Sequence, residues 1–235
     1  MLQSHRAFQS GDVQRTGGAS RALHTVSEKE YHEQGSRGER PPSNIHDYLP
    51  IPATPPSTGT PNGSQVSMQL LMCRTNLEGI HSLAPLPGFE VRVATPSDAS
   101  GIARVLTAAF EEEWSEDRVF RDLLRADDVR RTYVVEVNGT IASTASAQTI
   151  PDRWPDAGVL HWVGTDPEYA GHRYGFYVSH AVLVDHRRAG LREAYLLTDD
   201  FRIAAIKTYI SLGFVPVIEN PEQQEMWERV LPKIR

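Results

Sequence analysis

The stretch with the clearest potential for chemistry is residues 163–183, which read VGTDPEYAGHRYGFYVSHAVL. A β-prone run ends there, a turn containing Gly171 and Gly175 follows, and a helical pattern begins near Tyr174. Unpaired backbone N–H groups and the positive end of the helix dipole make such a turn a potential site for an anion, most often a phosphate. Two glycines at this spacing are also typical of a tight connection between a strand and a helix, so spacing alone leaves both interpretations open.

Other combinations of reactive residues do not form a recognisable site. Asp185, His186 and the scattered serines lack the spacing of a nucleophile elbow. The pair Asp199 and Asp200 fits the end of a strand and the cap of a helix better than a metal site. Cys73 is the single cysteine, and no Cys/His cluster indicates zinc. The sequence therefore predicts no metal.

Charge and hydropathy exclude further classes of function. The chain has 235 residues and a formal net charge of −6, which is a poor basis for binding nucleic acid, since that requires net neutralisation of phosphates. No apolar run reaches the roughly 18–20 residues of a membrane span, and the N-terminus has no signal-peptide pattern. We therefore expect a cytoplasmic protein with neither a nucleic-acid nor a membrane partner.

The apolar residues are unevenly distributed along the chain. Residues 1–64 hold seven of the 16 prolines and seven of the 17 glycines but few apolar side chains. Such a segment buries too little apolar surface to offset the entropy of ordering its backbone. The sequence predicts a largely disordered leader over residues 1–64 and one folded domain over residues 65–235.

The elements that must position the turn at residues 170–175 follow from apolar periodicity and turn signals. Asn138-Gly139 between two alternating runs is the strongest hairpin signal. The order of elements predicts a mixed α/β or α+β domain rather than a doubly wound parallel sheet. The expected strands are 68–74, 89–94, 132–137, 140–148, 159–165, 193–198, 214–218 and 226–230, and the expected helices run to about residue 112 and over 116–125, 176–189 and 203–212.

Residues 68–230 resemble the GNAT superfamily, the acyl-CoA-dependent N-acetyltransferases, and in particular the bacterial branch that includes mycothiol-synthase-type domains. Three segments carry the resemblance. Residues 163–183 match the family's coenzyme A motif, residues 196–217 (LLTDDFRIAAIKTYISLGFVPV) repeat the family order of its later motif, and residues 89–106 (FEVRVATPSDASGIARVL) are a common GNAT opening. The resemblance implies a mixed, mostly antiparallel sheet of about six to seven strands flanked by about four helices.

The family's pyrophosphate loop has the pattern Q/R-x-x-G-x-G/A, which falls on residues 170–175. Gly175 matches it, whereas Ala170 replaces the Arg or Gln and Arg173 replaces the first glycine. A side chain at residue 173 could crowd the pyrophosphate, or its guanidinium could bind the anion in place of the charge missing at residue 170. We expect coenzyme A binding to be retained. The residues implied in it are Gly171, His172, Arg173, Tyr174 and Gly175.

The resemblance also implies roles for residues of the later elements. Strand 159–165 would bind the pantetheine arm through Val163 and Thr165, where it parts from its neighbour, strand 193–198. Tyr209 stands where a GNAT tyrosine commonly protonates the departing thiolate.

The proton acceptor is less well defined by the sequence. His161 lies on the strand that would line the acyl site and could accept the amine proton directly or through water. From the residues alone, however, His161 also fits a hydrogen-bonded core histidine and Tyr209 a core aromatic. The glutamates at 111–113 could attract a cationic amine, although such a run is usually a solvated helix end.

The resemblance therefore implies an enzyme that transfers an acetyl group from acetyl-CoA to an amine of a small molecule or a protein by direct attack. The alternative is a non-catalytic GNAT-like module that binds acyl-CoA as a sensor, and its motivation is the departure from the pattern at Ala170 and Arg173. A third hypothesis is an interaction protein that acts through residues 1–64.

Overall fold

The computed structural model describes residues 69–234. The predicted leader and the predicted boundary after residue 64 lie outside the described residues. Within them, no helix is both long and apolar enough to cross a bilayer. The elements are β1 (Leu70–Arg74), β2 (Glu90–Val93), η2 (Pro96–Asp98), α2 (Ala99–Phe110), α3 (Glu116–Val119), η3 (Phe120–Leu124), β3 (Val129–Val137), β4 (Thr140–Gln148), β5 (Ala157–Thr165), η4 (Pro167–Tyr169), α4 (Tyr174–Arg188), β6 (Glu193–Thr198), α5 (Ile203–Ser211), β7 (Val215–Val217) and α6 (Pro221–Ile234).

The strands form one seven-stranded sheet in the order β2-β3-β4-β5-β6-β1-β7. Every neighbouring pair is antiparallel except β5 and β6, which run parallel. Strand β1 lies between β6 and β7, so the first described strand is paired with two strands that follow much later in the chain. The mixed, mostly antiparallel sheet expected from the resemblance is confirmed.

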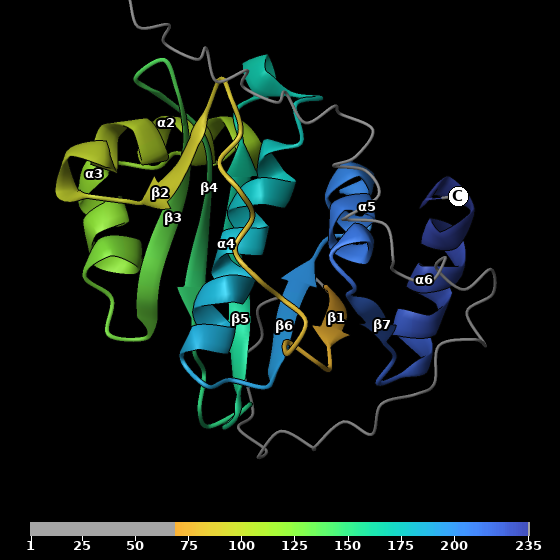
Figure 1. Ribbon diagram of the computed structural model, residues 1–235. Coiled ribbons are helices and arrows are strands. Elements are labelled where there is room, and N and C mark those ends of the chain that lie inside the picture. The colour runs from red at the N-terminus through yellow and green to blue at the C-terminus, as the bar shows by residue number, and fades with distance from the viewer. Residues whose placement is uncertain (1–68, 235) are drawn as a thin grey trace, which may run out of the picture. The chain divides into compact units, whose positions relative to one another are not determined.

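Helices cover both faces of the sheet (Figure 1). Side chains alternate between the faces along a strand, and on β3 Val134 packs with the buried residues of α2 while Val135 packs with those of α4. Helices α2 and α3 therefore cover one face. Helices α4, α5 and α6 cover the other, where Val178, Ile206 and Trp227 belong to one apolar cluster.

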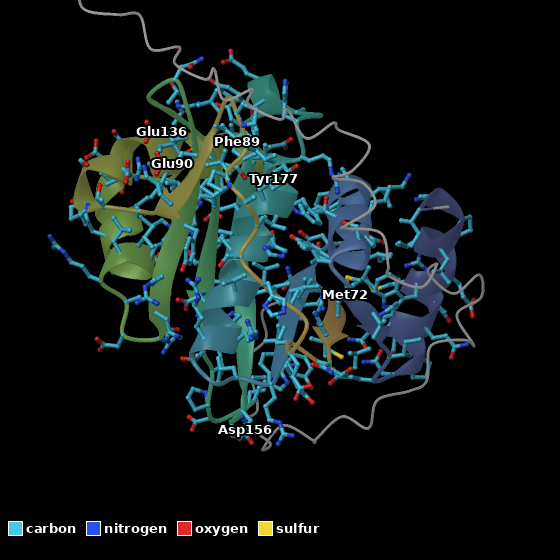
Figure 2. All side chains as sticks on the ribbon, viewed as in Figure 1. Met72, Phe89, Glu90, Glu136, Asp156 and Tyr177 are labelled. Atoms are coloured by element: carbon cyan, nitrogen blue, oxygen red, sulfur yellow. The ribbon has the colours of Figure 1, made fainter. Side chains whose placement is uncertain are left out.

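Helix α4 is buried on more than one side because residues 75–89 run across it (Figure 1). The Arg187 side chain donates a hydrogen bond to the carbonyl of Ile80 at 2.9 Å, and Arg188 donates one to the Ser82 hydroxyl at 2.8 Å. At the other end of the segment the ring of Phe89 lies 4.9 Å from that of Tyr177. Both side chains are labelled in Figure 2. Helix α4 is thus fixed between the sheet and this segment.

The predicted last strand at residues 226–230 is wrong, since these residues lie in helix α6. Asn220 begins the helix by accepting a hydrogen bond from the backbone N–H of Gln223 at 2.8 Å, and Pro221 takes the first helical position. Trp227, Val230 and Leu231 are buried on one face at helical spacing. The segment 226–230 (MWERV) is too short for periodicity to separate strand from helix.

Replacing Trp227 by alanine tests the packing of α6. Its side chain is 0% exposed, so Trp227→Ala is expected to lower the free energy of unfolding by about 3–5 kcal/mol through lost burial and a residual cavity. Urea unfolding followed by circular dichroism measures the change. Glu225→Ala, at an exposed position of the same helix, is the control and should change it by less than about 0.5 kcal/mol. Equal effects of the two substitutions would contradict the packing of α6.

Candidate functional site

Strands β5 and β6 pair at one end only. Their parallel pairing covers Ala157 to Val159 on β5 and Glu193 to Tyr195 on β6, and it ends there. Beyond that point β5 continues to pair with β4, and β6 continues to pair with β1. The edges that face each other therefore have backbone groups without a ladder partner. The parting of these two strands, which the resemblance implied, is present.

A bulge in β5 lies just past this point. Ser146 on β4 is opposite His161, and Thr144 is opposite Gly164, so β5 has one residue more than β4 between these pairs. Trp162 lies in the bulge with a φ of 47°, in the left-handed region that non-glycine residues rarely adopt. Such a bulge bends the strand and redirects its side chains, and here it follows shortly after the last β5 residue that pairs with β6.

The loop between β5 and α4 presents a run of unpaired donors. Within residues 69–234, no hydrogen bond uses the backbone N–H groups of residues 171–175. Gly171 has a φ of 85° and Arg173, the N-cap of α4, has a φ of 61°. These five donors stand at the positive end of a 15-residue helix, which is the arrangement that binds phosphate.

The loop is held where it leaves β5 by contacts that the sequence did not predict. The Asp166 carboxylate caps η4 by accepting a hydrogen bond from the N–H of Glu168 at 2.9 Å, and it also forms an ion pair with Arg104 of α2. Thr165 at the end of β5 shares a hydrogen bond of 2.8 Å with Ser143. The Asp-Pro dipeptide at 166–167 is a signal for a cap, but nothing in the sequence links it to a residue 62 positions earlier.

Gly175 brings the start of α4 close to the end of β5. A Cβ atom at residue 175 would lie 3.3 Å from Oγ1 of Thr165, which is closer than most real contacts. The structure thus places Thr165 beside the N–H donors of the loop. Val163, two residues earlier, packs with the apolar cluster under α4.

The side chains of the loop point in different directions. The guanidinium of Arg173 is exposed and lies over the ring of Phe176, with 4.7 Å from Cζ to the ring centroid. The exposed imidazole of His172 stacks on Tyr174 at 5.4 Å. The Tyr174 ring itself is buried, 5.1 Å from the ring of Phe89, so only its backbone N–H remains available to a ligand.

Tyr209 lies on α5 and is buried in the cluster under α4 and α5. Burial raises the pKa of its phenol well above the usual range, and the charge of Asp199 raises it further, against the opposing effect of Arg202. Within residues 69–234, no group accepts a hydrogen bond from its hydroxyl. The phenol is therefore protonated at any pH at which the protein would be assayed.

His161 lies on β5 on the opposite face of the sheet. It shares a face with Ser146, whose hydroxyl is hydrogen-bonded to Thr132, and its ring centroid lies 4.9 Å from that of Trp162. Burial lowers the pKa of the imidazole to about 4, only partly offset by Asp128. His161 and Tyr209 are not brought into contact, because they lie on the two opposite faces of the sheet.

The features of this region define a known class of domain. Residues 100–214 match the sequence profile of the acetyltransferase (GNAT) family. The mycothiol acetyltransferase of Actinosynnema mirum is 27% identical over 163 residues, which cover 65% of this chain and 53% of the relative. The chain thus spans about half the length of that curated relative.

Solved structures agree with the fold. A GNAT-family protein from Novosphingobium aromaticivorans is 22% identical and superimposes with a TM-score of 0.50, covering 71% of this chain and 66% of that one. Among the described residues, no group of three or more His, Cys, Asp or Glu side chains is arranged to hold a metal ion.

The ionisation of His161 can be measured directly. We expect the imidazole signals of His161 in NMR spectra to titrate with a midpoint near pH 4, because burial disfavours the charged ring. An unfolded histidine titrates near pH 6.5, so this group contributes stability above that pH, and the contribution is lost as the pH falls toward 4. His161→Gln assigns the signals. A midpoint at or above 6.5 would contradict the burial of the ring.

Proposed function

We propose that this chain is an acetyl-CoA-dependent N-acetyltransferase that acts on a primary amine of a small molecule or a protein. The observation that carries the proposal is the run of five unpaired N–H donors at residues 171–175, located beside the strand end where β5 has parted from β6. The donors suit a pyrophosphate, and the unpaired strand edges suit the amide groups of a pantetheine arm. The match of residues 100–214 to the GNAT family profile supports this assignment.

The proposed reaction is a direct transfer. The amine nitrogen attacks the thioester carbonyl carbon, a C–N bond forms, and the C–S bond breaks. The sulfur leaves as a thiolate that takes up a proton, and the nitrogen loses one. Two groups of this chain, one on each face of the sheet, are proposed for these proton transfers.

Tyr209 is the proposed donor to the thiolate. Its raised pKa keeps the phenol protonated until a strong base is formed beside it. His161 is the proposed acceptor from the amine. Its lowered pKa makes it a weak base, but it keeps the ring neutral at pH 7 and so able to accept a proton.

The alternative of a non-catalytic acyl-CoA sensor rests on Ala170 and Arg173, which depart from the family pattern. The guanidinium of Arg173 lies over the ring of Phe176 in the first turn of α4, so its positive charge adds to that of the helix N-terminus, which favours retained binding. The alternative predicts tight binding of acetyl-CoA without turnover.

The cytoplasmic location stays a prediction from composition.

Tyr209→Phe tests the proton donor. We expect it to lower kcat by about 10²–10⁴-fold, since general acid catalysis contributes factors of this size. Release of the thiol from acetyl-CoA measures the rate, and calorimetry should show unchanged binding of coenzyme A. Tyr195→Phe, which removes a phenol whose hydroxyl is hydrogen-bonded to Glu193, is the control. Full activity of Tyr209→Phe would exclude Tyr209 as the donor.

Arg173 variants test the anion site. Arg173→Met keeps the length of the side chain but removes its charge, and we expect the Kd of coenzyme A to rise about tenfold through loss of a charge-assisted contact. Arg173→Lys keeps the charge and should raise the Kd less. Both variants keep a side chain at the left-handed position, so backbone strain is matched. Tighter binding by Arg173→Met would show that the guanidinium hinders the anion.

A further inference from the structure

The side chains on the α2 face of the sheet form a surface where β5 and β6 part. Val159 and Tyr195 are the last paired residues of the two parallel strands. Since side chains alternate along a strand, the side chains two residues further on, His161 and Leu197, project from this same face on either side of the parting. An acceptor that approaches the proposed base His161 from this face therefore meets β6 at Leu197.

This surface is apolar and uncovered. Leu197 is 43% exposed, and Phe201, which follows the end of β6, is 70% exposed. In the part of the chain that the structure describes, only Leu83 and Val93 are comparable large apolar side chains, and they belong to other regions. Two of the four such residues thus lie within five positions of each other beside the proposed site. Exposed apolar groups gathered in this way are typical of a ligand or partner surface.

Arg202 connects this surface to the end of α2. Its guanidinium lies 4.4 Å from the ring centroid of Phe110 and 5.4 Å from that of Phe201. It also donates hydrogen bonds to the carbonyl of Ala109 at 3.1 Å and to Oδ2 of Asp199 at 2.9 Å. Asp199 neutralises the charge of Arg202, and the planar guanidinium contacts the rings of both Phe110 and Phe201.

Phe110 connects Arg202 to the part of β5 that carries His161. Its ring meets Trp162 edge to face, with 5.2 Å between centroids, and Trp162 is next to His161 in the bulge. The rings of Phe201, Phe110 and Trp162 and the guanidinium of Arg202 therefore form a continuous chain of contacts. We refer to these four residues and Leu197 as the aromatic wall.

Two uncompensated carboxylates follow the wall at the end of α2. Glu111 and Glu113 are exposed and have no ion pair or hydrogen bond from their side chains within residues 69–234, whereas Glu112 is paired with Arg118 at 2.6 Å. The C-terminal end of a helix adds a partial negative charge. The local field therefore favours a cation, and an ammonium group is the form in which a primary amine arrives at pH 7.

Resting on the proposed function, we propose that the acceptor is a primary amine carried on an aromatic or branched aliphatic body. The body contacts Phe201 and Leu197 of the aromatic wall, and the ammonium group is attracted by Glu111 and Glu113. This assigns specificity to residues outside the loop and the strand edges that bind the acyl donor. A strongly hydrated amine, such as an amino sugar, gains little from the wall because its hydroxyl groups lose water there.

The experiment compares phenethylamine with ethanolamine and glucosamine as acceptors, with thiol release from acetyl-CoA as the measure. We expect kcat/KM to be highest for phenethylamine. Phe201→Ala should lower that value about tenfold, as for loss of an apolar contact in a binding site, and should leave the value for ethanolamine unchanged. Because the Phe201 side chain is 70% exposed, the substitution should have little effect on folding. Leu83→Ala, an exposed apolar side chain on the segment that crosses α4, is the matched control and should change nothing.

The charge contribution has a separate test. The double variant Glu111→Gln and Glu113→Gln should raise the KM of every amine, and the effect should shrink at high salt because exposed charges are screened. The Kd of coenzyme A should stay the same. Unchanged KM values at low salt would remove the carboxylates from the proposal.

Several outcomes overturn the inference while leaving the proposed function intact. These are a preference for glucosamine, an equal response of Phe201→Ala and Leu83→Ala, or a change of sedimentation coefficient in Phe201→Ala, which would show that the surface binds a second copy. Failure of the proposed function is recognised differently: no amine in the panel releases thiol, although calorimetry shows acetyl-CoA bound. That result overturns the inference as well.

Discussion

The parting of β5 from β6 is the constraint on which the rest of this domain depends. A strand that leaves its neighbour loses ladder hydrogen bonds, so each strand must be held from its other side. Strand β4 pairs with β5 as far as Thr165, and β1 pairs with β6 as far as Thr198. The inserted strand β1 is therefore as important to the site as the strands that line it.

The paired end of the two strands is held by close packing. The ring of His186 on α4 lies against Gly158, where a Cβ atom would come within 2.3 Å of the ring. Nε2 of His186 lies 3.3 Å from the carbonyl oxygen of Val159, the last residue of β5 that pairs with β6. Burial lowers the pKa of this imidazole to about 4, so the ring is neutral and its Nε2–H can donate to that carbonyl. Helix α4 thus fixes the point at which the strands begin to separate, while its other end presents the unpaired N–H groups.

Local signals predicted much of this architecture. Asn138 and Gly139 have φ values of 49° and 80°, as a type I′ turn requires, and they join β3 to β4 as expected. The strand, loop and helix at residues 163–183 were also identified, because a glycine-containing turn between periodic segments is a short-range pattern. The unpaired N–H groups of residues 171–175 were expected for the same reason, since they belong to one continuous stretch.

Features that depend on distant residues were not predictable. Nothing in residues 70–74 shows that the strand will insert between β6 and β7, because pairing partners are chosen by the whole sheet. The ion pair of Arg104 with Asp166 and the contact of Arg202 with Phe110 join elements far apart in sequence. The helix α6 was mistaken for a strand because its apolar positions could be assigned only once the cluster that they pack against was known.

Arg173 departs from the family's sequence pattern but has a backbone conformation that glycine readily adopts. The family pattern places a glycine at this position, and the residue here has a φ of 61°, in the region that glycine enters without steric cost. The substitution has therefore kept the shape of the loop at a cost of about 1–2 kcal/mol for an L-residue in that region. A glycine would remove this cost, and the contact of the arginine guanidinium with the Phe176 ring offsets only part of it, since an exposed cation–π contact contributes about 0.5–1 kcal/mol. The remaining strain is located beside five unpaired donors at a helix N-terminus, and strained backbone of this kind is concentrated at ligand sites, which is consistent with the proposed role of the Arg173 charge.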